Sequence, residues 1–295
     1  MRLLVAVVRR GGLAAASEDL SMTPSAVSRG LARLEARLGV RLLERTTRRV
    51  ALTPEGERFY EASRRILADI EETEVAVAAS RGRPHGLLRV NSGVAFAVHQ
   101  LARALPTFRG TYPEVELELS VTDQIIDPVA ENVDLTIRTG SVMDDRLVGR
   151  AFTQFRRIIC AAPDYLEQKG WPRQPRDLFD HDCINVASTP HLSRWPFRGE
   201  NGVEFLEPTR GLRIDNAEAV LALGLAGGGI VRLGDVVVSE SIRAGLLVPL
   251  LADFNADETQ PILAVFAPGR QRLPKVRVFL DFLAETFGHV PWRLS

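Results

Sequence analysis

The first fifty residues repeat apolar and polar positions at helical spacing, with turn residues between the repeats. Helices are expected over 2–9, 13–20 and 23–37, the first ended by a glycine pair and the last two joined by a turn at 21–23. In the third helix, Leu31, Leu34 and Leu38 recur at spacings of three and four, which predicts a buried stripe. Two short helices joined by a tight turn are typical of a helix-turn-helix, whose second helix enters the DNA major groove.

Behind these helices the pattern predicts a small wing and then one long helix. Leu42 and Leu43 anchor the wing, and 50–52 return as a strand. Thr53 and Pro54 are suited to the N-cap and the first helical position of the next helix, expected over 54–80. Its apolar positions follow the spacing of paired helices, at Phe59, Ala62, Ile66, Ile70 and Val77. We interpret this face as a dimerisation seam, and packing against its own domain is the alternative.

After a hinge at 81–86, rich in glycine and arginine, the pattern changes to alternating strands and helices. Strands are expected over 87–90, 115–121, 135–138, 147–152, 156–162, 183–187, 203–206, 211–214, 230–233, 247–250 and 262–267. Helices are expected over 95–108, 125–131, 163–169, 176–179, 216–227, 234–244 and 274–287. Such alternation predicts an α/β fold with mostly parallel sheets. We expect one domain over 87–295, with lobe I at about 87–155 and 262–295, lobe II at about 156–261, and a cleft between them.

The net charge of zero hides a local asymmetry. Residues 1–53, the expected winged helix-turn-helix, hold ten arginines and four acids, or 10 − 4 = +6. Residues 54–80 hold three arginines and seven acids, or 3 − 7 = −4. We call residues 1–53 the head. A basic head beside an acidic helix favours binding to the phosphates of double-stranded DNA.

The hydropathy and the cysteine content indicate the cellular compartment of the protein. No apolar run approaches 18 residues, and the N-terminus has no secretory signal, so we expect neither a membrane span nor export. With only Cys160 and Cys183 present, we expect a reducing cytoplasm and two buried thiols, a redox switch being the alternative.

The DNA-contacting residues are expected at the start of the third helix and in the wing. Thr23 is the expected N-cap and Pro24 the first helical residue. Serine hydroxyls can bond phosphates or base edges, and an arginine can donate two bonds to guanine. The residues of these types along the helix are Ser25, Ser28, Arg29 and Arg33, the last expected at phosphate. In the wing, Arg48 or Arg49 is suited to a narrow minor groove.

A ligand site is expected where the strands of the α/β domain end. Ser92 and Gly93 end the first strand and begin a helix, whose N–H groups can hold an anion. The other polar residues at strand ends and at a helix start are Thr122, Asp123, Arg138, Thr139 and Asn216. The hydroxyls could instead cap the strand ends, and Arg138 could instead pair with Asp134.

The motifs resemble one known family along essentially the whole chain. The segments that carry the resemblance in the head are 14–17 (AAAS), 26–29 (AVSR), 42–46 (LLERT) and 52–56 (LTPEG). Further matching segments are 86–90 (GLLRV), 134–140 (DLTIRTG), 162–166 (APDYL) and 227–230 (GGGI). Together they are similar to LysR-type transcriptional regulators. The chain begins part-way through the family's usual first helix, so we expect either a short first helix or a truncated or misassigned start.

The resemblance implies a transcriptional regulator with a periplasmic-binding-protein-like effector domain. It implies a homodimer or tetramer, contact with RNA polymerase, a small organic acid as effector, and effector contacts around Ser92, Thr122 and Thr139. No metal or other cofactor is expected, because the five histidines lack ligand spacing. The alternative is a solute-binding protein or an enzyme with an incidental helical module. We expect no enzyme, because no acid, base or nucleophile is evidently placed for catalysis.

Overall fold

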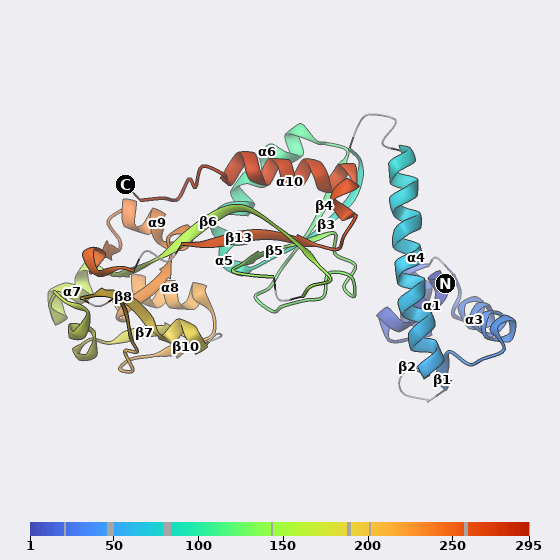
Figure 1. Cartoon of the computed structure of the whole chain (residues 1–295), viewed down its shortest axis with the longest axis horizontal. Helices are drawn as coiled ribbons and strands as arrows, with labels where there is room; N and C mark the ends of the chain where they lie inside the picture. The colour runs from blue at the N-terminus through green and yellow to red at the C-terminus, as the bar shows by residue number, and fades with distance from the viewer. Residues whose placement is uncertain are drawn as a thin grey trace. The chain divides into compact units, whose positions relative to one another are not determined.

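The computed structural model describes residues 1–20, 22–45, 50–78, 84–142, 144–187, 190–200, 202–256 and 259–294. They form two compact units, one made mainly of 1–83 and the other mainly of 84–295. The first unit is helical with a small two-stranded wing, and the second combines a mixed sheet with helices (Figure 1). The predicted α/β class with an N-terminal winged helix-turn-helix is confirmed.

The first unit is built on three short helices, α1 (Arg2–Arg10), α2 (Leu13–Asp19) and α3 (Pro24–Leu38). Gly11 and Gly39 end α1 and α3 in the left-handed conformation, with φ of 69° and 70°. The buried side chains that form its core are Leu4, Ala6, Val7, Ala16, Val27, Leu31, Leu34 and Leu42. Leu38, expected in the buried stripe, is instead exposed, because it lies in the last turn before the chain leaves the helix.

The wing and the long helix follow as predicted. Strands β1 (Leu43–Arg45) and β2 (Val50–Leu52) pair antiparallel, and α4 extends over Pro54–Ala78. The Thr53 hydroxyl accepts the Gly56 N–H at 3.0 Å, so Thr53 caps α4. The same hydroxyl donates to the Arg41 carbonyl at 2.7 Å, which ties the start of α4 to the base of the wing.

The second unit contains one large mixed sheet among its described residues. Its strands are β3 (Gly86–Ser92), β4 (Val115–Val121), β5 (Leu135–Thr139), β6 (Val148–Ala161), β7 (Cys183–Val186), β10 (Arg213–Ile214), β11 (Ile230–Gly234), β12 (Val248–Pro249) and β13 (Thr259–Phe266). The order is β10-β7-β11-β6-β13-β5-β3-β4, with β12 beside β6. Parallel pairing is confined to β4-β3-β5 and β10-β7-β11, so the expectation of mostly parallel sheets is wrong.

The antiparallel centre of this sheet joins two lobes. We call the side with β3, β4 and β5 lobe I and the side with β7, β10 and β11 lobe II. The strands expected at 147–152 and 156–162 are one strand, β6, because antiparallel pairing with β13 continues through residues 153–155 between them. The pairing of β6 with β13 shifts register between Ile262 and Leu263.

Helices and a hairpin complete both lobes. In lobe I, α5 (Val94–Phe96), the π-helical segment η2 (Ala97–Leu101) and α6 (Ala102–Thr111) follow without a break, and α10 covers Pro274–Phe287. Lobe II contains α7 (Pro163–Lys169), the 3-10 helix η3 (Pro175–Asp180), α8 (Ala217–Leu225), α9 (Asp235–Arg243) and a hairpin of β8 (Trp195–Gly199) and β9 (Gly202–Leu206). The shorter 3-10 turns are η4 (Pro190–Ser193), η5 (Ala252–Phe254) and η6 (Arg270–Arg272). The helix expected at 125–131 is a turn.

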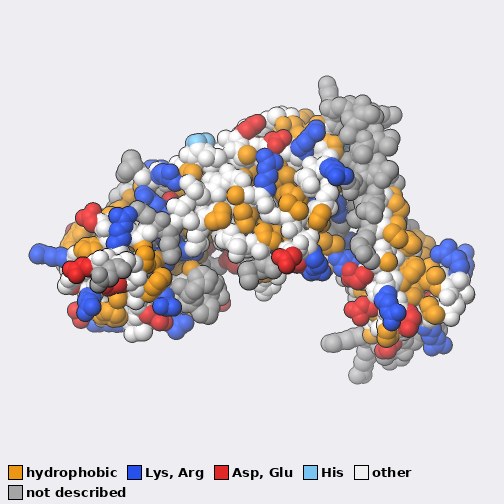
Figure 2. All heavy atoms as spheres, viewed as in Figure 1, with side chains coloured by type: hydrophobic (Ala, Val, Ile, Leu, Met, Phe, Trp, Pro, Cys, Tyr) orange, Lys and Arg blue, Asp and Glu red, His pale blue; other side chains and the backbone are white. Residues whose placement is uncertain are grey.

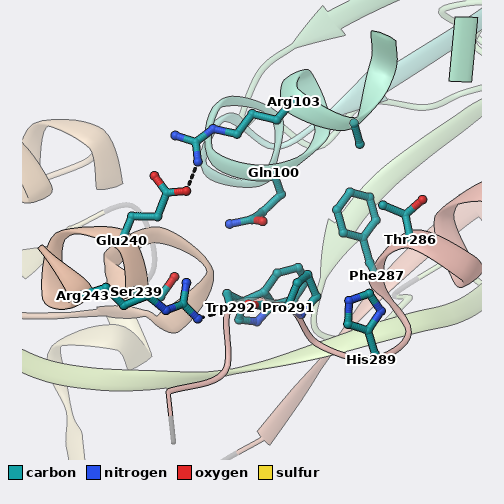
Figure 3. A pocket seen from close by; sticks show the side chains of 11 residues that line it. Gln100, Arg103, Ser239, Glu240, Arg243, Thr286, Phe287, His289, Pro291 and Trp292 are labelled. Carbon is teal, nitrogen blue, oxygen red and sulfur yellow. Dashed lines mark hydrogen bonds and ion pairs between the residues drawn. The ribbon is translucent and has the colours of Figure 1, made fainter. Parts of the chain in front are cut away.

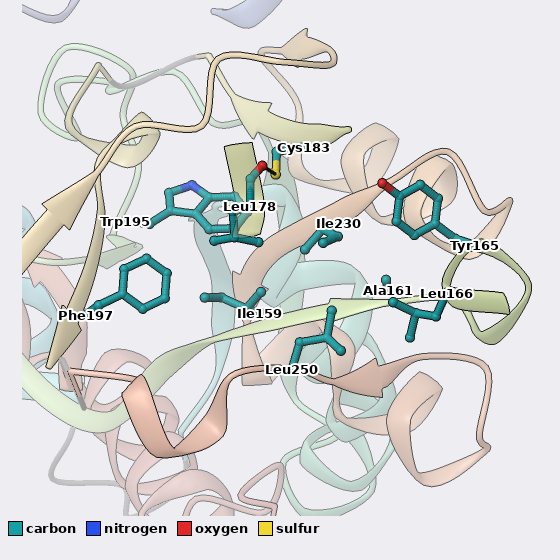
Figure 4. Packing of buried hydrophobic residues seen from close by; sticks show 10 residues of the cluster. All are labelled: Ile159, Ala161, Tyr165, Leu166, Leu178, Cys183, Trp195, Phe197, Ile230 and Leu250. Carbon is teal, nitrogen blue, oxygen red and sulfur yellow. Dashed lines mark hydrogen bonds between the residues drawn. The ribbon is translucent and has the colours of Figure 1, made fainter. Parts of the chain in front are cut away.

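Each lobe has an aromatic core. In lobe II, Trp195 and Phe197 of the hairpin pack with residues of β6, α7 and β11 (Figure 4). In lobe I, the Phe108 and Phe279 rings lie 5.0 Å apart at 87°. Trp195 and Trp292 are buried, whereas Trp171 is 56% exposed.

The two cysteines are buried thiols, as predicted. Neither Cys160 nor Cys183 is accessible to solvent. Burial raises the pKa of each thiol to about 12, and at Cys183 the Asp182 carboxylate adds to this effect. Across the described ranges, every helix is too short or too polar to cross a membrane.

Candidate nucleic-acid interface and ligand site

Helix α3 divides its residues between the core and solvent. Val27, Leu31 and Leu34 are buried, whereas the polar candidates of the opposite face, Ser25, Ser28, Arg29 and Arg33, are exposed. Arg33 lies one turn after Arg29, and its Nε donates to the Arg29 carbonyl at 3.4 Å. Ser25, Arg29 and Arg33 follow one another at a spacing of four and so share one solvent-facing stripe, and Ser28 is exposed beside it.

The start of α3 is held as predicted. The Thr23 hydroxyl accepts the Ala26 N–H at 3.3 Å, and Pro24 takes the first helical position. The Ser25 hydroxyl is 3.1 Å from that of Thr23. These contacts satisfy an N–H group at the helix start and place Ser25 at the exposed end of the helix.

The turn from α3 into the wing depends on a residue that sequence reasoning missed. One carboxylate oxygen of Glu35 accepts the N–H groups of Leu42 at 2.8 Å and Leu43 at 3.2 Å. The sequence signal that could have identified Glu35 is its position on the inward side of α3, opposite the stripe of arginines. Arg48 and Arg49, the expected minor-groove residues, lie outside the described residues.

Part of the positive charge of the head is already paired. Asp19 contacts Arg9 at 3.0 Å and Arg10 at 2.5 Å. Hydrogen bonds, first from Arg10, lower the pKa of Asp19 to about 2. Asp19 balances one of these two positive charges, so one remains at α1 and α2 in addition to the other arginines of the head, including Arg29 and Arg33.

The predicted seam on α4 divides between two environments. Phe59 packs partly buried against the core of its own unit, and Ala62 is half-buried. Further along the helix, Ile66 and Ile70 are 40% and 39% exposed, at a spacing of one turn. Phe59 thus matches the alternative of packing within its own domain, and the apolar stripe beyond it is exposed to solvent. The side chain of Val77 lies outside the described residues.

In the second unit, three parallel strands of lobe I bring their polar ends together. Ser92 pairs with Val121 of β4 and Ile137 of β5 in the sheet register. Ser92 is fully buried, and its hydroxyl donates to the Gly93 carbonyl at 3.1 Å. The Thr122 N–H donates to the Ser92 carbonyl at 3.0 Å, and the Thr122 hydroxyl accepts the Gln124 N–H at 3.2 Å. Both hydroxyls therefore act in the structure as strand-end caps.

The N–H group expected to hold an anion already has an anionic partner. The Asp123 carboxylate accepts the Val94 N–H at 2.9 Å. A β-carbon added to Gly93 would lie 3.5 Å from the same carboxylate oxygen, so the strand end and Asp123 are in contact. Asp123 thus takes the place, at the first turn after β3, that the sequence assigned to a ligand.

Arg138 contacts neutral oxygens at this strand end rather than Asp134. Its guanidinium donates to the Asn91 side-chain oxygen, to the Gln124 carbonyl at 3.1 Å and to the Ile137 carbonyl at 2.9 Å. Burial lowers the pKa of Arg138, and the nearby Asp123 carboxylate opposes this effect. A half-buried cation whose direct partners among the described residues are neutral is suited to a carboxylate ligand.

The alternative pairing of Arg138 with Asp134 is therefore wrong. Asp134 is buried and contacts Lys275 at 2.7 Å and Arg270 at 3.1 Å, and it also accepts the Arg89 N–H at 3.0 Å. Asp134 directly precedes β5, and four residues of extended chain span about 13 Å, which is too far for Asp134 and Arg138 to pair directly. Sequence reasoning missed Asn91 and Gln124 as partners of Arg138, although Asn91 directly precedes Ser92.

The lobe II candidate, Asn216, is the N-cap of α8. Its side-chain oxygen accepts the Ala219 N–H at 3.0 Å. Two residues later, Glu218 contacts His99 of lobe I, with His99 Nε2 at 3.0 Å from a carboxylate oxygen. The start of α8 and the helix that follows Ser92 therefore meet between the lobes. Thr139 is exposed at the end of β5.

Comparison with known proteins identifies the family. Residues 1–57 match the family described as "Bacterial regulatory helix-turn-helix protein, lysR family", and residues 81–288 match "LysR substrate binding domain". The chain belongs to the LysR family of transcriptional regulators. As a member of that family, this LysR-type chain is a DNA-binding transcriptional regulator with an effector-binding domain.

Individual relatives align with this LysR-type chain over nearly its full length. It is 34% identical to the HTH-type transcriptional regulator CrgA of Neisseria meningitidis, over 98% of this chain and 96% of that protein. It is 36% identical to the HTH-type transcriptional regulator DmlR of Escherichia coli, over 99% and 95%. The solved structure of CrgA, 35% identical, matches with a TM-score of 0.67 over 97% of both chains.

Proposed function

We propose that this regulator binds operator DNA through the exposed stripe of α3 and responds to a small organic acid at the strand ends of lobe I. The observation that carries the DNA contact is the division of α3 itself. Arg29, Arg33, Ser25 and Ser28 face solvent on one side, while the opposite side is buried in the core of the head. Such a helix presents charge and hydrogen-bond donors to a groove without losing packing.

We further propose how the chain is divided into domains that carry out this function. The head is 1–53, the linker helix 54–80, the hinge 81–86 and the effector domain 87–295. The exposed Ile66 and Ile70 support pairing of two α4 helices, which gives a homodimer with two heads for two half-sites, and a tetramer from two such dimers. The regulator acts in the cytoplasm, contacts RNA polymerase at the promoter, and controls transcription without catalysing a reaction.

For the effector, the proposal rests on the charge at the strand ends. Arg138 has neutral direct partners, and Asp123 already accepts the Val94 N–H. An organic acid would pair with Arg138, and its arrival would bring a second carboxylate close to Asp123. A ligand whose affinity differs between two lobe arrangements shifts the population between them, which links the site to the heads.

Substitution of Arg29 tests the DNA contact. Arg29→Ala should weaken operator binding at least tenfold, because a bidentate contact to a base contributes about 1–3 kcal/mol. Arg109→Ala removes the same charge from an exposed position of α6 and should leave operator affinity within twofold. Fluorescence anisotropy with operator and with unrelated DNA measures both affinities. Equal losses for the two variants would remove Arg29 from recognition.

A thermal-shift screen tests the effector site separately. Small organic acids that bind the folded state should raise the melting temperature of the regulator. Arg138→Gln should abolish the shift, and the conservative Arg138→Lys should retain part of it. A hit whose shift is unchanged in Arg138→Gln would place the ligand elsewhere.

A further inference from the structure

A pocket separate from the strand ends lies between the lobes, with a volume of about 440 Å³. Its walls come from three segments that are distant in sequence: the helix 97–111 of lobe I, α9 of lobe II, and the end of the chain from Thr286 to Trp292 (Figure 3). The volume lies within the range of small-molecule sites, roughly 300–1,000 Å³. The pocket shares none of the strand-end residues assigned above to the effector.

The apolar part of the pocket is a rigid aromatic wall. Phe287 and Trp292 line it, with ring centres 6.0 Å apart. Behind them, Phe96 lies 5.1 Å from Phe287 and 6.2 Å from Trp292, both in edge-on geometry. Rings packed in this way keep their positions, so the wall offers a fixed surface for a flat or compact apolar group.

The polar part of the pocket has an excess of positive charge. Arg103 and Glu240 pair with each other across the two lobes. Arg243 also lines the pocket, and its guanidinium donates to the backbone carbonyls of Pro291 at 3.1 Å and Arg293 at 3.3 Å. These two acceptors are neutral, so among the charged side chains that line the pocket two guanidinium groups face one carboxylate.

One further group at this pocket lacks a partner. The indole N–H of Trp292 is buried and has no hydrogen-bond acceptor among the described residues. A buried donor without an acceptor is unusual, because buried polar groups are normally paired. A ligand oxygen bound beside Arg243 and the aromatic wall would bring an acceptor to this end of the pocket.

From this arrangement we propose that the pocket is a second ligand site, which takes a small monocarboxylate with an apolar body. Arg243 binds the carboxylate, and Phe287 and Trp292 contact the apolar part. The ligand touches residues of both lobes, so it stabilises the lobe arrangement in which Gln100 of lobe I donates to the Val236 carbonyl of lobe II at 2.8 Å. The site is independent of the effector site at the strand ends.

The test uses the full-length protein and phenylacetate as the probe, with ligand-observed NMR titration as the measurement. Phenylacetamide has nearly the same shape without the charge, and 2-phenylethylamine carries the opposite charge. Wild type should bind phenylacetate saturably and at least tenfold more tightly than either comparison compound. The absence of saturable phenylacetate binding, or tighter binding of the amine, would overturn the proposal.

Three variants assign the site. Arg243→Gln should remove the preference for the acid over the amide, and Arg243→Lys should retain part of it. Ser92→Ala, at the strand ends, should leave the preference unchanged. A preference that survives Arg243→Gln, or that disappears in Ser92→Ala, contradicts the assignment.

A fourth variant distinguishes loss of ligand binding from loss of structure. This control is needed because Arg243 also donates to the backbone carbonyls of Pro291 and Arg293. Glu240→Gln removes the one carboxylate of the pocket and frees Arg103. It should tighten phenylacetate binding at least threefold, a gain that partial unfolding cannot produce. Unchanged or weaker binding by a folded Glu240→Gln protein would refute the role of pocket charge.

Discussion

Gly56 tests how the long helix is attached to the head, because this helical glycine lies against the backbone of the wing. A β-carbon at position 56 would lie 1.9 Å from the Leu42 carbonyl oxygen and 2.8 Å from the carbonyl carbon. Leu42 cannot easily move away. Its N–H donates to Glu35 at 2.8 Å, and its carbonyl accepts the Thr53 N–H at 3.0 Å. Gly56→Ala should therefore separate the start of α4 from the wing.

The expected change in the free energy of unfolding combines two destabilising effects and one stabilising effect. Overpacking costs about 1–3 kcal/mol, and loss of the bond between Thr53 and Leu42 costs about 1 kcal/mol. The higher helix propensity of alanine returns about 1 kcal/mol. The free energy of unfolding of the first unit should thus fall by about 1–3 kcal/mol, the opposite of the usual effect of Gly→Ala in a helix.

Two spectroscopic signals separate the units in a urea titration. All three tryptophans of the chain, Trp171, Trp195 and Trp292, belong to the second unit, so their fluorescence reports only its unfolding. Far-ultraviolet circular dichroism reports both units. A transition that appears in circular dichroism but not in fluorescence therefore reports the first unit. Gly56→Ala should lower the midpoint of that transition and leave the fluorescence midpoint unchanged.

The matched control is Gly110→Ala in α6, where an added β-carbon meets no atom within 4 Å. That variant should be as stable as wild type or gain up to about 1 kcal/mol. If the head of Gly56→Ala unfolds at the same urea concentration as wild type, or a higher one, the close approach to Leu42 does not constrain the protein.

Other groups yield predictions of the same kind. Glu35→Ala leaves two N–H groups of the wing turn without their acceptor and should cost the first unit about 2 kcal/mol in urea unfolding; a loss below 0.5 kcal/mol would argue against this role. Burial raises the pKa of Asp235 to about 6 despite N–H bonds from Arg156 and Val236, so folding favours its protonated form. Its stabilising contribution is therefore complete below about pH 4 and is lost as the pH rises through 6. The loss is of the order of 3 kcal/mol, and Asp235→Asn should flatten this slope in unfolding followed by tryptophan fluorescence. Cys160 and Cys183 should resist a thiol reagent at pH 8 and react after unfolding in urea, and rapid native labelling would contradict their burial.

Local signals in the sequence determined the helices of the head and their ends. Thr23 and Pro24 begin α3 as predicted, and Gly39 ends it, because an N-cap hydroxyl, a first-turn proline and a left-handed glycine act on the backbone within a few residues. The division of α3 into a buried and an exposed side followed from its period, except at Leu38, where the helix ends.

Tertiary structure decided which charged and polar groups meet. Asp134 directly precedes the strand that contains Arg138, yet its cationic partners are Arg270 and Lys275, more than a hundred residues away. Asp123 reaches the Val94 N–H only because β3 and β4 are parallel neighbours. The sequence by itself thus determined the head, its helix ends and the family. Only the fold decided that the expected anion site already contains a carboxylate, because strand order and register, rather than local pattern, bring distant charges together.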